Sequence, residues 1–309
     1  MPRLSLKRRL QRKLPRVLKS ARQWIHVLAN GRRPGARLVF VVGAQRSGTR
    51  LPLEILDESP EISTFSEGTD PYFERVLLRP LEQIEDQVRR SPASVIALKP
   101  ICETHRTNEL LERFPRSKAI WIFRHFEDTV NSATVKWTSG RAAVRRLATR
   151  EFKPSDWRAG GLTDEKLRLV ARLYHEGMSE HEANAVLWYL RNDLFFALDA
   201  AQRDDVLLVR YEDLLKEPRA HAARIFDFIG VPVPAGAFGA IRGGERPRRP
   251  FPAISADVRR LCEDLHQRLI EHYRSELNLP ASALSARNPV RSPATPLGAG
   301  ISPEPPNHR

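Results

Sequence analysis

A glycine loop that directly follows an apolar run is the part of this chain best suited to bind a phosphate. Leu38–Val42 reads as a buried strand, and it leads at once into the loop 43–49, whose sequence is GAQRSGT. Apolar residues at helical spacing begin at Leu51. In a strand, loop and helix of this order, backbone N–H groups and the helix dipole point at an anion. A nucleoside triphosphatase has lysine at the position of Thr49, so the loop predicts a phosphate site without Mg-ATP hydrolysis.

Three further apolar runs of strand type also end in a basic residue. They are Val95–Leu98 before Lys99, Ala119–Phe123 before Arg124, and Val206–Val209 before Arg210. Ligands of doubly wound sheets bind beyond the carboxyl ends of the strands. Together with Arg46 in the loop, these cations predict a pocket for a ligand that carries several negative charges.

Apolar runs alternate with helical segments along most of the chain. This order predicts an α/β fold, with a P-loop-like doubly wound parallel sheet flanked by helices. The expected domains are a basic amphipathic arm at 1–37, one large domain at 38–280 with a helical cap at 138–186, and a disordered tail at 281–309. The segments with helical spacing are Leu51–Glu58, Phe73–Arg89, Thr107–Phe114, Asp128–Trp137, Asp164–Leu198, Leu214–Ile229 and 257–274, and Gly230 is expected to end the sixth.

The formal net charge of +14 lies entirely in the first fifty residues. They hold fourteen of the 51 basic residues and no acidic residue, so the other 37 basic residues equal the 37 acidic ones. A neutral body argues against a nucleic-acid-binding domain. The arm fits three interpretations: a segment that packs on the domain or is solvated, a peripheral membrane contact through residues 1–30, and a transit peptide.

Cysteine use and hydropathy narrow the expected compartment. Cys102 and Cys262 provide neither a disulfide framework nor a zinc site, and no metal is expected. No apolar run is long enough to cross a membrane. The expected location is therefore cytoplasmic, with membrane association where the arm binds anionic lipid.

Three separated motifs together resemble the sulfotransferases that use 3′-phosphoadenosine-5′-phosphosulfate (PAPS), in their bacterial and protein-tyrosine branch. The first is the loop 43–49, the second runs from Ala119 to Ser132, and the third is VRYEDLL at 209–215. The similarity extends from about Leu38 to Pro234. It implies transfer of a sulfuryl group from PAPS to a hydroxyl acceptor (a carbohydrate, lipid or other small molecule) by in-line displacement, with no metal.

The resemblance also implies which residues bind the donor. The loop is expected to hold the 5′-phosphosulfate, and Arg124 and Ser132, eight positions apart, the 3′-phosphate. A guanidinium suits this role because its planar fork binds phosphate oxygens in pairs. A structural ion pair with Glu127 or Asp128 is the alternative for Arg124. The expected donor-binding residues are Arg46, Ser47, Gly48, Thr49, Arg50, Arg124 and Ser132.

Two residues compete for the role of general base. Glu67 follows a strand expected at Glu61–Phe65 and matches the glutamate of the protein-tyrosine branch. His105 has the side chain that the cytosolic branch of the family uses. The sequence favours Glu67 and leaves His105 open. Lys99 is expected to stabilise charge between the sulfate and the leaving group.

Two other classes of function stay open at this point. One is a nucleotide-dependent phosphotransferase of related P-loop fold, against which the missing loop lysine counts. The other is a non-catalytic nucleotide-binding module, against which Glu67 and Lys99 count. Candidates to stack on an acceptor are Trp137, Trp157 and Tyr72, and the glycines and arginines at 242–249 are candidates to close over the nucleotide.

Overall fold

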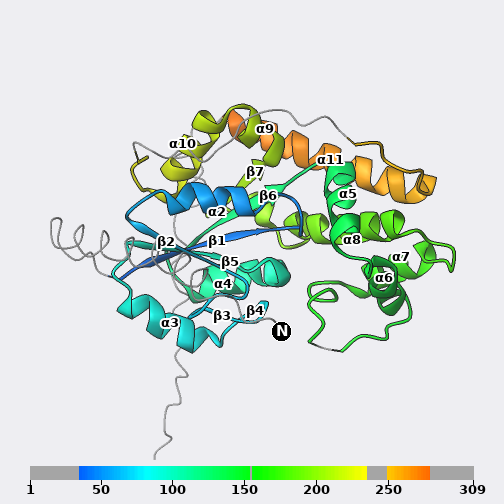
Figure 1. Cartoon of the computed structure of the whole chain (residues 1–309), viewed down its shortest axis with the longest axis horizontal. Coiled ribbons are helices and arrows are strands. Elements are labelled where there is room, and N and C mark those ends of the chain that lie inside the picture. Colours follow the sequence, from blue (N-terminus) through cyan, green and yellow to red (C-terminus); the bar gives the residue numbers. More distant parts are fainter. Residues whose placement is uncertain (1–34, 154, 235–248, 279–309) are drawn as a thin grey trace, which may run out of the picture.

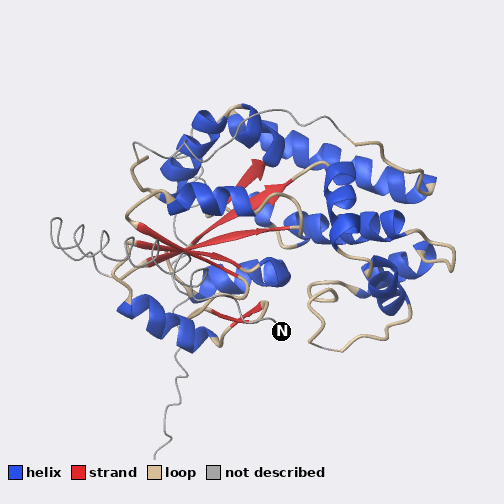
Figure 2. Cartoon of the chain, in the orientation of Figure 1, coloured by secondary structure: helices blue, strands red, loops and turns tan. Residues whose placement is uncertain are grey.

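A five-stranded parallel sheet forms the centre of the computed structural model, which describes residues 35–153, 155–234 and 249–278 (Figures 1 and 2). The strand order is β2-β5-β1-β6-β7, with β1 in the middle. This confirms the predicted α/β fold and all five predicted strands of the sheet. Their bounds are Arg37–Gly43 (β1), Ile62–Ser66 (β2), Val95–Lys99 (β5), Lys118–Phe123 (β6) and Val206–Arg210 (β7).

Helices cover both faces of this sheet (Figure 2). One face packs on α2 (Arg50–Asp57), α9 (Tyr211–Lys216) and α10 (Pro218–Ile229). The opposite face packs on α4 (Thr107–Arg113), α5 (Phe126–Lys136), α8 (Glu180–Ala197) and α11 (Ala256–Leu277). Because successive strand residues point to opposite faces, a strand covered on both sides must be apolar throughout, and this produces the continuous runs seen in the sequence.

Three predicted helices are interrupted in the structure. Phe73–Arg89 contains a short hairpin, β3 (Phe73–Glu74) with β4 (Leu77–Leu78), before α3 (Leu81–Arg90) begins after Pro80. Asp164–Leu198 divides into α7 (Asp164–Leu173) and α8, because the Ser179 side chain accepts a hydrogen bond from the Glu182 amide and starts a new helix. Leu214–Ile229 divides at Pro218, which is the first residue of α10 rather than an interior one.

The other predicted helices are confirmed, with ends shifted by a few residues. Gly230 ends α10 in the left-handed region, as expected. The remaining elements are α6 (Gly140–Ala148) and the 3₁₀ segments η1 (Ile101–Arg106) and η2 (Ala200–Gln202). The predicted arm at 1–37 and tail at 281–309 lie almost wholly outside the described residues, as does most of the candidate closing segment at 242–249. Among the described helices, none has the length and apolar character needed to cross a bilayer.

Candidate active site

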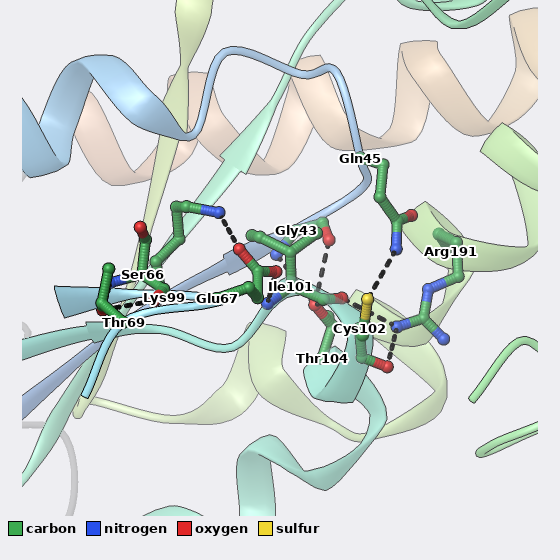
Figure 3. A network of polar contacts seen from close by, with 10 residues as sticks. All are labelled: Gly43, Gln45, Ser66, Glu67, Thr69, Lys99, Ile101, Cys102, Thr104 and Arg191. Carbon is green, nitrogen blue, oxygen red and sulfur yellow. Dashed lines mark hydrogen bonds and ion pairs between the residues drawn. The ribbon is translucent and has the colours of Figure 1, made fainter. Parts of the chain in front are cut away.

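The glycine loop begins where β1 pairs with β6. Gly43 has φ +132°, and a Cβ atom at this residue would lie 2.3 Å from the carbonyl oxygen of Ile122. Only glycine fits such a close approach. The buried hydroxyl of Thr104 lies 3.2 Å from the Gly43 amide nitrogen and 2.9 Å from its carbonyl oxygen (Figure 3). The loop is therefore anchored to η1, the segment that follows β5.

The second half of the loop leaves polar groups available for an anion. Ser47 is fully buried, and its Oγ has no hydrogen-bond partner among the described residues. Thr49 is the N-cap residue of α2, and its side chain makes no capping hydrogen bond. Gly48 has φ +86° and packs so closely on the ring of Tyr211 that a Cβ atom would lie 2.1 Å from it. A buried hydroxyl without a partner costs about 1–3 kcal/mol, so a phosphate that accepted this hydrogen bond would stabilise the loop.

Two arginines of the loop region point in different directions. The Nε of Arg46 donates a hydrogen bond of 3.0 Å to Ser132 Oγ on α5, and its guanidinium carbon lies 5.8 Å from the centre of the Trp137 ring. Arg50 instead binds Glu54 on the outer side of α2 at 2.6 Å, with 85% of its side chain exposed. The structure therefore joins Arg46 to the second predicted phosphate element and places Arg50 apart from it.

Arg124 directly follows β6 and contacts two side chains, Tyr211 and Asp128. Its guanidinium carbon lies 4.8 Å from the centre of the Tyr211 ring, and its Nη2 lies 3.6 Å from an Asp128 carboxylate oxygen. Glu127, the other alternative partner, binds Arg259 at 3.2 Å. The Nε of Arg124 is buried without a partner among the described residues. The ion pair with Asp128 is thus present, but it leaves hydrogen-bond donors unused.

The third motif ties the ends of β6 and β7 together. The amide of His125 donates a hydrogen bond of 2.9 Å to Glu212. Arg210 lies 3.4 Å from both Glu212 and Asp213. Since Arg210 already has two carboxylate partners, it contributes less positive charge to this edge of the sheet than Arg46 or Arg124.

Glu67 and Lys99 form an ion pair at the ends of neighbouring strands (Figure 3). Ser66 pairs with Lys99 in the parallel register of β2 and β5, so the residue after β2 meets the end of β5. The Ile101 amide donates a second hydrogen bond of 3.0 Å to Glu67 Oε1. Both side chains are largely buried, with 17% and 15% exposed for Glu67 and Lys99. This pair lies next to the glycine loop, because the following segment η1 carries the threonine that anchors the loop.

His105 lies in η1 and packs closely against the glycine pair Gly160 and Gly161. A Cβ atom at Gly160 would lie 2.4 Å from His105 Nε2, and the Nδ1 is buried without a partner among the described residues. Burial, followed by the charges of Arg191 and Arg106, lowers the pKa of His105 to about 4. The imidazole is therefore neutral at physiological pH.

A cavity of about 290 Å³ adjoins the first half of the loop. The loop contributes Ala44 and Gln45, and two of the candidates for stacking on an acceptor, Trp137 and Trp157, also line it. Tyr72 does not: it is a core residue whose ring lies 4.6 Å from that of Phe65. Val76, between β3 and β4, and Cys102 of η1 also line the cavity. The remaining wall comes from α5, α8 and the stretch between them, in the residues Thr129, Val130, Ala133, Ser139, Gly140, Arg158, Asn184, Leu187, Trp188, Leu190 and Arg191.

Four residues of this region were missed in the sequence: Gln45, Thr104, Arg158 and Arg191. A weak signal existed for Arg191, which interrupts the apolar helical stripe through Leu187, Leu190 and Leu194 and therefore had to be buried. The others lie in loops or in a 3₁₀ segment, where spacing carries no information about direction.

A parallel α/β sheet with a glycine loop at its central strand, unused donors in that loop and an acid–lysine pair beside it is an arrangement suited to a phosphorylated ligand. Residues 37–242, about two thirds of the chain, match the Sulfotransferase domain family. The chain belongs to this family, which confirms the resemblance seen in its motifs. It is therefore a PAPS-dependent sulfotransferase.

Several solved structures are similar to this chain at low identity. The sulfotransferase domain of the curacin biosynthetic pathway is 13% identical, with 75% of this chain and 98% of that chain covered and a TM-score of 0.44. A sulfotransferase from Alicyclobacillus acidocaldarius is 16% identical, with coverage of 80% and 98% and a TM-score of 0.40. For sulfotransferase STF9 from Mycobacterium avium the identity is 13%, the coverage 81% of each chain and the TM-score 0.45. No curated protein matches the chain.

Proposed function

We propose that this enzyme moves the sulfuryl group of PAPS to the hydroxyl of a small molecule bound in the cavity beside the glycine loop, with Glu67 as general base. The observation that carries the proposal is the Glu67–Lys99 pair, which lies beside the loop and is hydrogen-bonded to Ile101, the residue before Cys102 of the cavity wall. An acid and a cation in contact at that position provide what the reaction needs: a proton acceptor and a charge that stabilises the leaving group.

The donor is assigned to two groups of residues. The backbone of the loop, with Arg46, Ser47, Gly48 and Thr49, binds the 5′-phosphosulfate. Arg124 and Ser132 bind the 3′-phosphate. The hydrogen bond between Arg46 and Ser132 supports this, because it brings the two groups to one place across 86 positions of sequence. Arg50 is left out of the assignment, since its side chain is exposed and paired on the other side of α2.

The transfer itself is a single displacement at sulfur. The acceptor hydroxyl gives its proton to Glu67 while its oxygen forms a bond to sulfur. The bond between sulfur and the bridging oxygen of the donor breaks, and its electron pair leaves with adenosine 3′,5′-bisphosphate. Lys99 stabilises the charge that develops on this oxygen, so it must exchange part of its contact with Glu67 for a contact with the donor.

Glu67 is preferred to His105 on position. A base must lie within hydrogen-bond reach of the proton it takes. Glu67 lies beside the loop and accepts a hydrogen bond from Ile101, the residue before Cys102 of the cavity wall, whereas His105 is covered by Gly160.

Calorimetric titration with adenosine 3′,5′-bisphosphate, and separately with Mg-ATP, tests the donor site. We expect tight binding of the bisphosphate that is weakened by Arg124→Ala and by Ser132→Ala. Arg168→Ala removes a charge on the exposed side of α7 and serves as the control. Binding of Mg-ATP in place of the bisphosphate, or of neither nucleotide, contradicts the proposal.

The basic arm is assigned a separate role. We propose that residues 1–30 bring a cytoplasmic enzyme to anionic membrane surfaces, which the concentration of positive charge in this segment supports. Replacing Lys7, Arg8 and Arg9 with glutamine in the full chain is expected to weaken binding to phosphatidylglycerol vesicles. Equal binding by both proteins contradicts this role.

A further inference from the structure

The described wall of the cavity beside the loop is positively charged. Among the described residues, its lining contains Arg158 and Arg191 but no aspartate or glutamate. The rest is mainly aromatic and aliphatic, with the indoles of Trp137, Trp157 and Trp188. Cavities that bind small molecules are mostly apolar with a few polar groups that fix the orientation of the ligand, and here those groups are cations.

Arg191 is a buried charge without a counter-charge. It lies on α8 with 3% of its surface exposed. Its guanidinium donates to three carbonyl oxygens, those of Trp157 at 3.4 Å, Ile101 at 3.3 Å and Cys102 at 3.4 Å. No carboxylate among the described residues lies within ion-pair distance of it, and its Nε has no partner there. Burying an unpaired charge is costly, so a negative group brought by a ligand would be strongly favoured.

Neither of the titratable groups that shift the pKa of Arg191, the Cys102 thiol and the Arg158 guanidinium, neutralises its charge. Burial raises the pKa of the Cys102 thiol to about 11, so the sulfur is uncharged at neutral pH. Burial, with the nearby charge of Arg158, lowers the pKa of Arg191 to about 10, which still leaves the guanidinium protonated. The carbonyl dipoles thus hold a cation in place without neutralising it.

Arg158 adds a second cation at the same end of the cavity. Its guanidinium carbon lies 4.3 Å from the centre of the Trp157 ring, and that of Arg191 lies 5.5 Å from the same centre. Arg158 has one acidic neighbour, Asp156 at 3.7 Å, which Arg146 shares at 3.8 Å. Two guanidinium groups therefore lie against the same indole ring. The one carboxylate near them, that of Asp156, also pairs with Arg146 and cannot neutralise both charges.

A continuous series of contacts leads from the proposed base to these cations. Glu67 accepts a hydrogen bond from Ile101, the next residue Cys102 lines the cavity, and Arg191 binds the carbonyls of both (Figure 3). The same guanidinium reaches Trp157, on which Arg158 stacks. These contacts put Glu67 and the two arginines on either side of Ile101 and Cys102, so an acceptor in the cavity with its hydroxyl toward Glu67 would have its other end toward the arginines.

We propose that the acceptor is a small aromatic or apolar hydroxy compound that carries a negatively charged group, and that Arg158 and Arg191 bind this group. The inference rests on the proposed function, since it takes the cavity to be the acceptor site. A volume of about 290 Å³ is at the low end of ligand cavities, which run from roughly 300 to 1,000 Å³, so the compound is small.

Three probes of nearly equal shape test the charge requirement: para-hydroxyphenylacetate, the neutral para-hydroxyphenylethanol and the cationic tyramine. Their dissociation constants are measured by calorimetry on the full chain saturated with adenosine 3′,5′-bisphosphate. We expect the anion to bind about 10- to 100-fold more tightly than the alcohol, as for a charge-assisted hydrogen bond, and tyramine to bind most weakly.

Arg158→Gln then removes one cation from a side chain that is 30% exposed, so little disturbance of the fold is expected. In this variant the preference for the anion over the alcohol is expected to fall at least several-fold, because binding of the anion weakens more than binding of the alcohol. Arg168→Gln makes the same change of charge on the exposed side of α7 and leaves the preference intact. Arg191→Lys keeps a charge in place of the buried guanidinium and retains part of the preference.

Failure of this inference and failure of the proposed function have different signatures. Equal binding of anion and alcohol, tighter binding of the alcohol, or binding of none of the three probes overturns the charged acceptor while the donor complex stays intact. Absence of adenosine 3′,5′-bisphosphate binding overturns the donor assignment itself, and with it the inference. A preference that survives Arg158→Gln and Arg191→Lys undiminished shows that other residues bind the anion and also overturns it.

Discussion

The two proposed anion sites, the glycine loop and the cavity next to it, are built in different ways. The loop at 43–49 uses backbone groups, glycines too close to their neighbours for any side chain, and a buried hydroxyl with an unused proton. The cavity uses two guanidinium groups against a wall of indoles. A loop of this kind is specific for a phosphate-sized group because its shape is fixed by the chain itself. The cavity wall consists of side chains, which tolerate substitution, so it is the part in which one sulfotransferase can differ from another.

The largest expected effect comes from the pair that lies between these regions. Glu67→Gln keeps the shape of the side chain but removes the proton acceptor, so turnover is expected to fall by about 10²- to 10⁴-fold. Binding of adenosine 3′,5′-bisphosphate stays within about twofold, since the loop is untouched. Glu58→Gln, at an exposed position, is the matched control. Rapid turnover in Glu67→Gln together with loss of turnover in His105→Gln reverses the assignment of the base.

A methyl group in the loop tests whether its shape is fixed by contact. Gly48→Ala places a Cβ atom 2.1 Å from the ring of Tyr211 and strains a residue with φ +86°. Strain of this kind costs about 1–3 kcal/mol, so the bisphosphate is expected to bind roughly 10- to 100-fold more weakly. Gly230→Ala also has a positive φ, but its nearest neighbour is 3.6 Å away, and donor binding there is expected to be unchanged. Equal losses in both variants contradict a loop held by close packing.

Arg46 and Arg50 lie four positions apart in the sequence but point in different directions, so replacing each in turn tests which direction matters for donor binding. Arg46→Gln removes the guanidinium that reaches Ser132, and the bisphosphate is expected to bind roughly tenfold to hundredfold more weakly. Arg50→Gln breaks only an exposed pair with Glu54, which contributes little, so binding stays within about twofold. Calorimetry at one salt concentration compares them. A larger loss in Arg50→Gln than in Arg46→Gln contradicts the assignment of donor-binding residues.

The smallest effect is on stability and lies outside both regions. The pKa of His105 is about 4 in the folded protein and 6.5 when exposed, so below pH 6.5 the unfolded chain binds a proton that the folded one does not. The free energy of unfolding is therefore expected to fall between pH 6.5 and 4, by roughly 1 kcal/mol after allowance for solvent screening around this partly exposed ring, and to show no effect of this residue above pH 6.5. Urea unfolding of the wild type and of His105→Gln across this range measures it. Parallel pH profiles for the two proteins contradict a buried neutral imidazole.

Much of the fold was readable from the chain because the relevant signals are local. Val95–Leu98 and Ala119–Phe123 are apolar without interruption, since strands covered on both faces have no solvent-facing positions. The helix predicted at Phe73–Arg89 begins only at Leu81, because a hairpin of two short strands, β3 and β4, precedes Pro80 and has no periodic pattern of its own. Asp164–Leu198 was expected as one helix because its apolar stripe continues across the break before Ser179.

The chain on its own fixes the loop at 43–49, the strands around it and the residues that stand at their ends, because glycine positions and unbroken apolar runs act over a few residues. Which of those side chains meet is decided by the fold. Glu67 reaches Lys99 because β2 pairs with β5, and Arg46 reaches Ser132 because α5 lies across the loop. Arg50 points to solvent, where it pairs with Glu54 on the exposed side of α2. At the cavity, Arg158 comes from a loop and Arg191 from the buried helix α8, and both lie against Trp157. Strand order and side-chain direction depend on contacts between distant segments, and spacing within one segment carries no record of them.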